Sequence, residues 1–478
     1  MIILYCILGL VGVALILVLI SVINAGAKGK KIKLTDNFSI PHSKQEQYSK
    51  VLSQMIKFET VTSSNGNNQR SFDKYYLSLQ QLFPIFFAKS QSISIKNGYL
   101  FLVKGISSQK ANLVMAHSDV VPAEGEWLYP AYSGEIADDK IWGRGAIDNK
   151  GMLCAILLSL NKLLEGSYQP KYDLYIFSGC DEETFSQGAQ NCRNYFVEHK
   201  IWLDTTLDEG GVLSSGNYPT VDNDTALLGM GEKGYVDIEF TAEEQGGHSS
   251  MPHETTALAE LVKFMNYINT HQQFKVRFLP LIKQMFESIS PYMSFGLRIL
   301  LCNFWLYGGL LKLILPKVSP ATNAIVRTTL VFTRVNASLS NNTISPTATA
   351  IANIRTLPGQ SIKEVFDRLA KVASKFGLTA KILYSKDASK ITPPNCPHFA
   401  NLKALVAKIY PNTIVLPYIL SGASDACYMD DVSSQIIRFN PIKISTTQLN
   451  SMHSNDENVS QTEFAKSVDF MREYFLTK

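Results

Sequence analysis

The chain has 478 residues, which is enough for two domains because single hydrophobic cores rarely grow beyond about 250–300 residues. Hydrophobic residues make up 46% and charged residues 18% of the sequence, which is the ordinary balance of a globular protein. The net charge is only +4 and no dense basic run occurs, so the composition argues against a nucleic-acid partner.

Residues 1–27 are predicted to form a transmembrane anchor or a signal segment. Met1–Asn24 carries no charged side chain and is long enough to span a bilayer, which takes roughly 20 apolar residues. Ala25-Gly26-Ala27 also fits the small-residue cleavage site of a secretory signal. An uncleaved anchor is the favoured interpretation. The lysines that follow favour a cytoplasmic location for the body, whereas asparagine triplets for glycosylation favour a luminal or extracellular one. The lysines are Lys28, Lys30, Lys31 and Lys33, and the triplets begin at Asn37, Asn223, Asn336, Asn341 and Asn458.

After a polar linker at residues 28–45, residues 46–233 are predicted to form the first part of the main domain. Short apolar strands alternate there with helical patterns, which predicts an α/β fold with a mostly parallel sheet. In such sheets, ligand sites form beyond the carboxyl ends of the strands. The expected elements are a helix at Glu46–Lys57, a strand at Ala111–Ala116, a helix at Gly151–Leu164, a strand at Tyr172–Ser178 and a strand at Thr205–Leu207.

A second, α+β domain is predicted at residues 234–388, inserted before the second part of the main domain at residues 389–478. Its first strand, Val236–Thr241, alternates apolar and polar residues as a half-exposed strand does. Within it, Phe278–Leu315 is apolar but interrupted by prolines and glycines. We expect a buried helical pair there, with an exposed apolar surface for a lipid-like substrate or a membrane as the alternative. The remaining elements are a helix at Thr255–Thr270, strands at Thr328–Thr333 and Thr347–Arg355, a helix at Ile362–Phe376 and a strand at Thr379–Tyr384.

Acidic and histidine residues recur where the predicted strands of the main domain end. Two zinc ions about 3.5–4 Å apart need a bridging carboxylate, further ligands for each ion, and a base for the bridging water. The sequence offers these parts at five separate places. They are His117 with Asp119, Asp148 before a helix, the adjacent Glu182 and Glu183, the adjacent Asp208 and Glu209, and His453. The seven cysteines are scattered without a CxxC pair, which argues against a thiolate zinc site; we expect mostly buried free thiols, with one or two disulfides as the alternative.

These motifs resemble the co-catalytic zinc peptidase family of carboxypeptidase S and aminoacylase. The likeness covers residues 46–475 and is strongest to the branch of carboxypeptidase S and the N-fatty-acyl-amino-acid hydrolases. It implies a catalytic domain with a mostly parallel sheet and an inserted lid domain. The matching segments are Met115–Pro122, Gly143–Gly151, Asp181–Glu183, Leu207–Gly211, Met452-His453, Asn303–Leu306 and Thr322–Thr329.

The resemblance also implies a role for each residue of the metal site. Asp148 would bridge two Zn²⁺ ions, for which Co²⁺ or Mn²⁺ are substitutes. Glu182 would be the general base, and Asp119 would orient His117. The remaining ligands would be His117 and Glu209 for one ion, and Glu183 and His453 for the other. The choice of Glu209 over Asp208 is open at this point.

The lid residues implied by the resemblance are His248, Asn323 and Arg355. His248 would reach toward the scissile carbonyl, and Asn323 and Arg355 would engage the substrate, Arg355 by two parallel hydrogen bonds to a carboxylate. One departure concerns Ser424-Asp425-Ala426, where the branch usually has an arginine. That loss bears on substrate choice rather than on metal binding.

The expected function is therefore metal-dependent hydrolysis of the amide bond of N-acyl amino acids, including fatty-acyl ones and possible in reverse. The alternatives are a carboxypeptidase S-like enzyme acting on short peptides and a catalytically inactive, membrane-tethered binding protein. The expected partners are a small-molecule substrate and, through the N-terminal segment, a membrane. The body would be luminal or extracellular, and secreted if the segment is cleaved.

Overall fold

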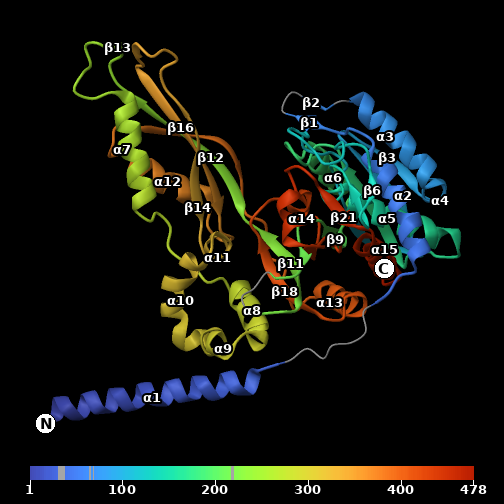
Figure 1. Cartoon of the computed structure of the whole chain (residues 1–478), viewed down its shortest axis with the longest axis horizontal. Coiled ribbons are helices and arrows are strands. Elements are labelled where there is room, and N and C mark those ends of the chain that lie inside the picture. Colours follow the sequence, from blue (N-terminus) through green and yellow to red (C-terminus); the bar gives the residue numbers. More distant parts are fainter. Residues whose placement is uncertain (31–37, 64–65, 68, 217–219) are drawn as a thin grey trace.

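The computed structural model describes residues 1–30, 38–63, 66–67, 69–216 and 220–478. Lys31, Lys33 and the triplet at Asn37, which bear on the orientation of the N-terminal segment, lie outside the described residues. Figure 1 shows a large body built on one sheet, a smaller body built on another, and a long helix, α1 (Ile2–Lys28), beside a group of short helices.

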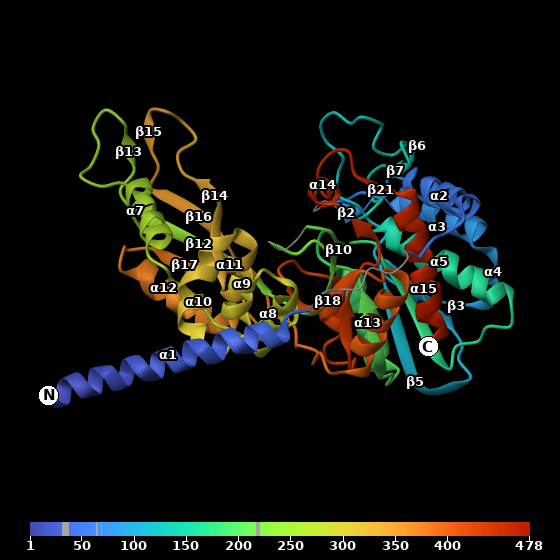
Figure 2. The ribbon, with the colours of Figure 1, turned by 60° about the horizontal axis from the view of Figure 1, so that its bottom comes forward.

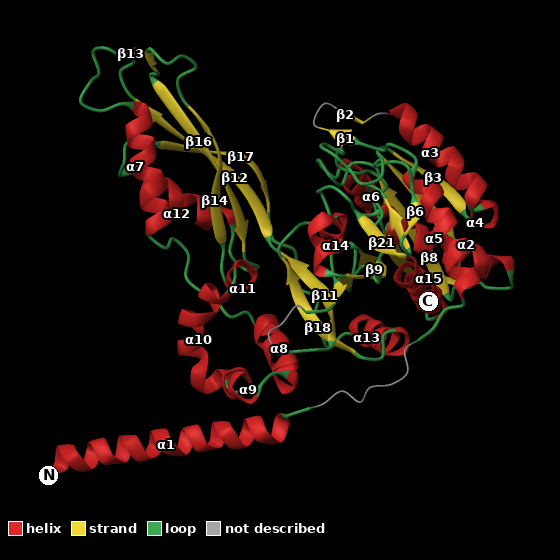
Figure 3. Cartoon of the chain, in the orientation of Figure 1, coloured by secondary structure: helices red, strands yellow, loops and turns green. Residues whose placement is uncertain are grey.

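A ten-stranded sheet forms the centre of the large body (Figure 3). Its order is β20 (Lys443–Ile444), β10 (Leu213–Ser214), β11 (Asp224–Glu232), β19 (Ile436–Arg438), β9 (Leu203–Asp208), β5 (Ser107–Met115), β8 (Tyr172–Gly179), β4 (Gly98–Val103) and β3 (Gln91–Ile95), with β18 (Thr413–Leu420) paired to β11. The strands in the middle, β19, β9, β5 and β8, pair in parallel. Antiparallel pairs β3–β4 and β4–β8 extend the sheet at one edge. The predicted α/β class with a mostly parallel sheet is confirmed.

Strand β5 shows why this sheet carries helices on both faces. Successive side chains of a strand point to opposite faces, so an unbroken apolar run suits a strand that is covered on both sides. Leu113 and Met115 pack in the cluster that includes α6 (Gln187–Glu198), whereas Val114 packs in the cluster of α5 (Lys150–Glu165) and α15 (Gln461–Leu476). Helix α2 (His42–Ile56) joins the α5 side, and α3 (Gln69–Leu82), α4 (Pro84–Lys89) and α13 (Pro397–Ile409) complete that cluster.

The smaller body is the domain that the sequence predicts as a lid, and we call it the lid domain. Its sheet is antiparallel, in the order β14 (Thr329–Asn336), β16 (Thr347–Thr356), β12 (Gly234–Glu243) and β17 (Thr379–Lys386). Buried and half-buried residues alternate along β12, as its sequence predicts. The buried side chains pack against α7 (Ala257–Thr270) and α12 (Ile362–Ser374). A short ladder of β13 (Gly247–His248) and β15 (Thr343–Ile344) stands at the far tip (Figure 1).

A helical insert at residues 280–326 lies between the two bodies and α1 (Figure 2). It contains α8 (Pro280–Ile289), α9 (Phe295–Leu301), α10 (Phe304–Val318) and α11 (Pro320–Val326). Helix α8 is buried in the core of the large body, where it packs near β18. Among the described residues, α1 is the one helix that is long and apolar enough to cross a membrane by itself, while α9 and α10 reach that length only as a pair bent by 104°.

Candidate metal centre

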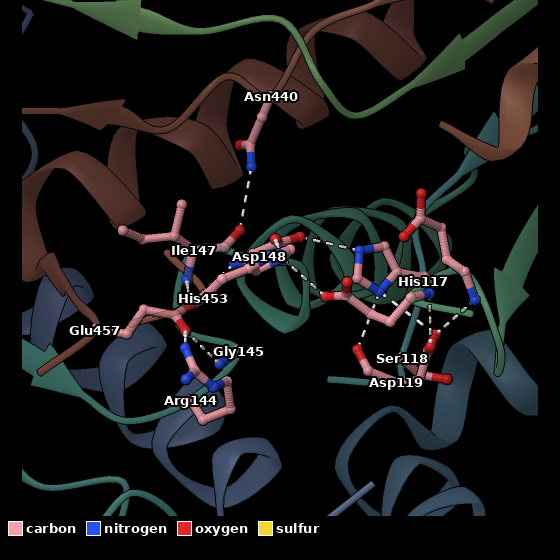
Figure 4. Close-up of polar contacts among 12 residues, drawn as sticks. His117, Ser118, Asp119, Arg144, Gly145, Ile147, Asp148, Asn440, His453 and Glu457 are labelled. Carbon is pink, nitrogen blue, oxygen red and sulfur yellow. Dashed lines mark hydrogen bonds and ion pairs between the residues drawn. The ribbon is translucent and has the colours of Figure 1, made fainter. Parts of the chain in front are cut away.

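His117 and Asp119 follow directly after β5 and are buried (Figure 4). The Nδ1 atom of His117 lies 3.0 Å from the backbone carbonyl of Asp119, and Nδ1 must donate because a carbonyl oxygen only accepts. An oxygen of the Asp119 carboxylate is 3.4 Å from the same Nδ1 atom. The carboxylate also accepts hydrogen bonds from the backbone N–H groups of Glu182 (3.2 Å) and Glu183 (3.0 Å). Asp119 therefore orients His117, with Nε2 facing the site, and holds the turn that carries both glutamates.

Asp148 lies between two histidines that are far apart in the sequence. Its Oδ1 atom is 3.0 Å from Nε2 of His117, and its Oδ2 atom is 2.9 Å from Nε2 of His453. Burial raises the pKa of Asp148, but the hydrogen bonds from the two imidazoles outweigh it and hold the pKa below its usual range. A carboxylate with one oxygen directed at each of two imidazoles has the geometry to bridge two cations.

Glu183 completes a cluster of potential ligands with these residues. Ligand atoms of His117, Asp148 and Glu183 all lie within 4.8 Å of one another. His453, which follows α14 (Thr446–Ser451), has its Nε2 atom 3.3 Å from Oε1 of Glu183. Hydrogen bonds to Asp148 and Glu183 raise the pKa of His453 to about 10. A proton on Nε2 thus stands where a divalent cation would bind.

The two acids at the end of β9 have different surroundings. The Oδ2 atom of Asp208 accepts a hydrogen bond of 2.8 Å from the backbone N–H of Ala426. Glu209 is close enough to Asp148 for that negative charge, after burial, to raise the pKa of Glu209 well above its usual value. Glu209 also lines a hollow of about 50 Å³ whose walls are mostly apolar. One oxygen of Asp208 therefore contacts the backbone, and Glu209 lies close to Asp148.

Glu182, Glu183 and Glu209 crowd negative charge into one buried region. Burial raises the pKa of all three. Repulsion from Asp425 raises the pKa of Glu182 further. Repulsion from Asp148 and Asp208 raises the pKa of Glu209, with smaller effects among the glutamates themselves. Carboxylates so arranged ionise only when positive charge compensates them. Imidazole and carboxylate groups are the ligands of zinc and of related divalent ions. The residues present therefore fit a divalent-cation site.

Glu457 is a supporting residue to which the sequence reasoning gave no role. Its buried carboxylate accepts backbone hydrogen bonds from Asp148 (3.1 Å) and Ile147 (2.8 Å) through Oε1. Through Oε2 it binds Nη1 of Arg144 (2.9 Å) and the backbone of Gly145 (3.1 Å). Figure 4 shows this carboxylate between Ile147 and Arg144, enclosed by the loop that carries Asp148. The one available signal was that Glu457 is an acid close to His453 in the sequence.

The segment Ser424-Asp425-Ala426, where the resemblance led us to expect an arginine, also borders the site. Asp425 is buried, and burial together with the nearby Asp208 raises its pKa to about 8. Its neighbour Ser424 donates to Glu232 at the end of β11, through both its backbone N–H (3.1 Å) and its hydroxyl (3.2 Å). The segment thus connects the metal centre to the strand that leads into the lid domain.

The predicted lid residues lie apart from this cluster. His248 is exposed at the tip of the lid domain, and its Nδ1 atom is 2.8 Å from the hydroxyl of Ser250. Asn323 accepts a hydrogen bond from Nε of Arg327. The Arg355 guanidinium lies 4.5 Å from the ring centroid of Tyr235. Among the described residues, no hydrogen bond or ion pair joins His248, Asn323 or Arg355 to the metal cluster, and Figure 1 shows the lid tip far from β9 and α14.

Comparison with known proteins gives the family. Residues 113–477 match the peptidase family M20/M25/M40. The N-fatty-acyl-amino acid synthase/hydrolase PM20D1 of Xenopus tropicalis is 31% identical over 443 residues, which cover 90% of this chain and 86% of that protein. The probable carboxypeptidase S-like 2 of Dictyostelium discoideum is 29% identical over 435 residues, covering 88% and 82%.

A solved structure has the same fold. It is the M20 family metallo-carboxypeptidase Sso-CP2 from Sulfolobus solfataricus, with a TM-score of 0.69 at 18% identity, covering 90% of this chain and 98% of that one. The family match spans most of the chain and contains all five predicted ligands, from His117 to His453. The chain is a member of peptidase family M20/M25/M40, metal-dependent hydrolases that cleave amide bonds.

Proposed function

We propose that this protein hydrolyses the amide bond of N-acyl amino acids, including those with a fatty-acyl chain, with two zinc ions. The observation that carries the proposal is the position of Asp148, whose two oxygens are directed at His117 and His453. The relatives named as N-fatty-acyl-amino acid synthase/hydrolase support the substrate class. The apolar walls of the hollow beside Glu209 are compatible with an apolar group of the substrate.

The proposed metal ligands fall into two sets that share Asp148. His117 and Glu209 would hold one ion, and Glu183 and His453 the other. Bound in this way, the ions would lower the pKa of a water molecule and polarise the scissile carbonyl. The interaction of Glu209 with the charge of Asp148 supports Glu209 as the ligand, and Asp208, one of whose carboxylate oxygens accepts a hydrogen bond from the backbone of Ala426, is the alternative.

Glu182 is the proposed proton carrier of the reaction. It would take the proton of the attacking water and return it to the leaving nitrogen, as a general base and then a general acid. Its backbone is held by Asp119, the residue that also orients His117. The turn and the histidine therefore keep their relative positions while the proton moves.

The lid domain would supply contacts to the substrate. We propose that it closes on the metal centre and brings His248 to the carbonyl oxygen and Arg355 to the free carboxylate. Asn323 would be a further substrate contact. Closure would also exclude water from the reacting groups.

A carboxypeptidase acting on short peptides is the second candidate. Relatives named carboxypeptidase S and carboxypeptidase S-like favour it, and the scissile amide and free carboxylate are common to both substrate classes. An inactive binding protein is the third, and the candidate ligand set argues against it.

The test compares two substrates on the full-length protein loaded with zinc. A long-chain N-acyl phenylalanine and a blocked dipeptide with the same carboxyl-terminal phenylalanine differ only on the acyl side. A higher kcat/KM for the acyl amino acid supports the proposal, whereas a higher value for the dipeptide selects the peptidase. Hydrolysis of neither, with two metal ions bound per chain, contradicts both.

Glu182→Gln is the matched control for the chemistry. It is expected to bind two metal ions per chain and to lose at least about 100-fold in turnover, which is the usual contribution of a general base. Loss of the metal ions would instead assign Glu182 to the ligands. Unchanged turnover would exclude Glu182 as the base.

We further propose that α1 keeps the protein on a membrane, with the catalytic body luminal or extracellular, or that its removal yields a secreted form. Extraction of the native protein from cells with carbonate and with detergent distinguishes the membrane-anchored form from the form that has lost α1. Release by carbonate would contradict the anchor.

A further inference from the structure

Helix α10 has an apolar face that the fold does not cover. Phe304, Leu311 and Leu315 pack into the core of the large body. On the other side, Leu313 is 69% exposed, and Leu310 and Ile314 are also exposed. Leucine and isoleucine side chains gathered on one face of a helix are normally covered in a water-soluble body. The uncovered half of α10 therefore needs an apolar surrounding that the described part of the chain does not provide.

The same helix begins at a contact with α1. Asn303, which is buried, accepts a hydrogen bond from Nδ2 of Asn24 (2.7 Å) and donates to the carbonyl of Ser21 (3.1 Å). The hydroxyls of Tyr307 and Ser21 are 2.8 Å apart. Figures 1 and 2 both show α1 beside α9 and α10. Hydrogen bonds thus join the corner between α9 and α10 to the last turns of α1.

This corner lies within the apolar part of α1, not beyond it. Ser21 precedes Lys28, the last residue of the candidate span, by seven residues, or about 10 Å along a helix. The residues that touch Ser21 therefore lie beside the apolar part of α1, about two turns from its end. Asn303, Tyr307, Leu310 and Ile314 are spaced as one stripe of a helix. The exposed leucine and isoleucine therefore continue the line of residues that meets α1.

A basic groove borders the same face of α10. It has a volume of about 540 Å³ and includes Lys275, Lys312, Lys317 and Arg327 around Leu313. Within the described part of the chain, none of the three lysines forms an ion pair. Free lysines beside an apolar helix face match the boundary of an anionic bilayer, with headgroups at the lysines and acyl chains at the leucines.

We propose that the outer face of α10, with Leu310, Leu313 and Ile314, docks on an anionic phospholipid bilayer and that the basic groove binds the phospholipid headgroups. The docking surface is a second attachment to the membrane, separate from α1. It sets the lid domain, whose strand β14 follows α11, at the lipid surface. The proposal stands whichever substrate the metal centre accepts.

The test uses the emission of a tryptophan placed on the outer face of α10 and brominated lipid that quenches it. Full-length Leu313→Trp is reconstituted through α1 into nanodiscs of phosphatidylcholine and phosphatidylglycerol, with or without brominated acyl chains. Leu339→Trp is the matched control, because Leu339 is fully exposed in the lid domain and far from the insert. No tryptophan occurs in α1, so the anchor itself contributes nothing to this signal.

We expect brominated lipid to remove most of the emission that the tryptophan at position 313 adds, and none of the emission added at position 339. Lys312→Gln with Lys317→Gln is expected to weaken docking about fivefold for each lysine in anionic discs, whereas Lys371→Gln with Lys375→Gln, at the carboxyl end of α12, leaves it unchanged. Emission at position 313 that brominated lipid does not quench overturns the proposal. If acrylamide quenches that emission, the face is in water; if acrylamide does not, a second copy or an acyl substrate covers it.

Discussion

Replacing Glu457 by glutamine tests whether this buried carboxylate holds the loop of the bridging aspartate in place. Each of its two oxygens accepts two hydrogen bonds, one pair from the backbone of Ile147 and Asp148 and the other from Arg144 and Gly145. Glutamine turns one oxygen into an NH₂ group that faces two donors. Two hydrogen bonds are lost, at roughly 1.5–3 kcal/mol each for a charged acceptor, and the Arg144 guanidinium stays buried without a counter-ion.

The free energy of unfolding is therefore expected to fall by about 3–5 kcal/mol, the usual effect of breaking a buried ion pair. Metal affinity is expected to fall about 10–100-fold, as for other groups that support a ligand. Urea unfolding with and without zinc, and a competition titration with a chromophoric chelator, measure the two quantities. The control is Glu473→Gln, whose carboxylate pairs with Lys408 at the surface and is expected to contribute about 0–1 kcal/mol. Equal losses of stability in the two variants, with unchanged metal affinity, would refute the reasoning.

Three further expectations concern the metal and the core. Asp119→Asn keeps the backbone contact with His117 but removes the carboxylate charge 3.4 Å from its Nδ1 atom and weakens the hold on the turn of Glu182 and Glu183, so zinc affinity in the chelator assay should drop about 10–100-fold; wild-type affinity would contradict this. Burial raises the pKa of Glu182 and Glu209 without metal, so the metal-free folded state loses stability as the pH rises. The decrease in Tm on chelation should therefore be larger at pH 8 than at pH 6, and a larger decrease at pH 6 would be evidence against charge crowding. Burial lowers the pKa of His398 well below 6.5, so the unfolded chain binds the extra proton and stability falls as the pH falls. His398→Gln should reduce that slope by up to about 1.4 kcal/mol per pH unit, and equal slopes in urea unfolding between pH 5 and 7 would count against it.

Sequence pattern predicts those parts of this molecule that depend on local periodicity. The apolar run in β5 predicted a strand that is buried on both faces, as in the large body. The alternation of apolar and polar residues in β12 predicted a strand that is buried on one face, as in the lid domain. The polar residues after β5, β8 and β9 were expected to meet because the carboxyl ends of parallel strands share one edge. The structure brings His117, Asp148 and Glu183 together there, although their roles as ligands stay predictions.

Contacts that depend on the pairing of segments far apart in the chain could not be predicted from the sequence. Glu457 meets the Asp148 loop because β21 (Asn458–Ser460) pairs with β7 (Lys140–Trp142), and no local pattern announces that pairing. The placement of His248 depends on how the lid domain is oriented, which periodicity does not encode. Likewise, large apolar residues occur on both the buried and the exposed side of α10, so its sequence did not reveal which side the core would leave open.

Proteolytic removal of α1 would break the hydrogen bonds that join α1 to the helical insert. Cleavage after Ala27 would remove the carbonyl of Ser21 and the amide of Asn24, and Asn303 would lose two of its partners at once. The guanidinium of Arg298 would lose the carbonyl of Ala25 as well. A shed form would therefore carry newly hydrated polar groups at the base of α10, and it would differ from the tethered form in surface chemistry as well as in location.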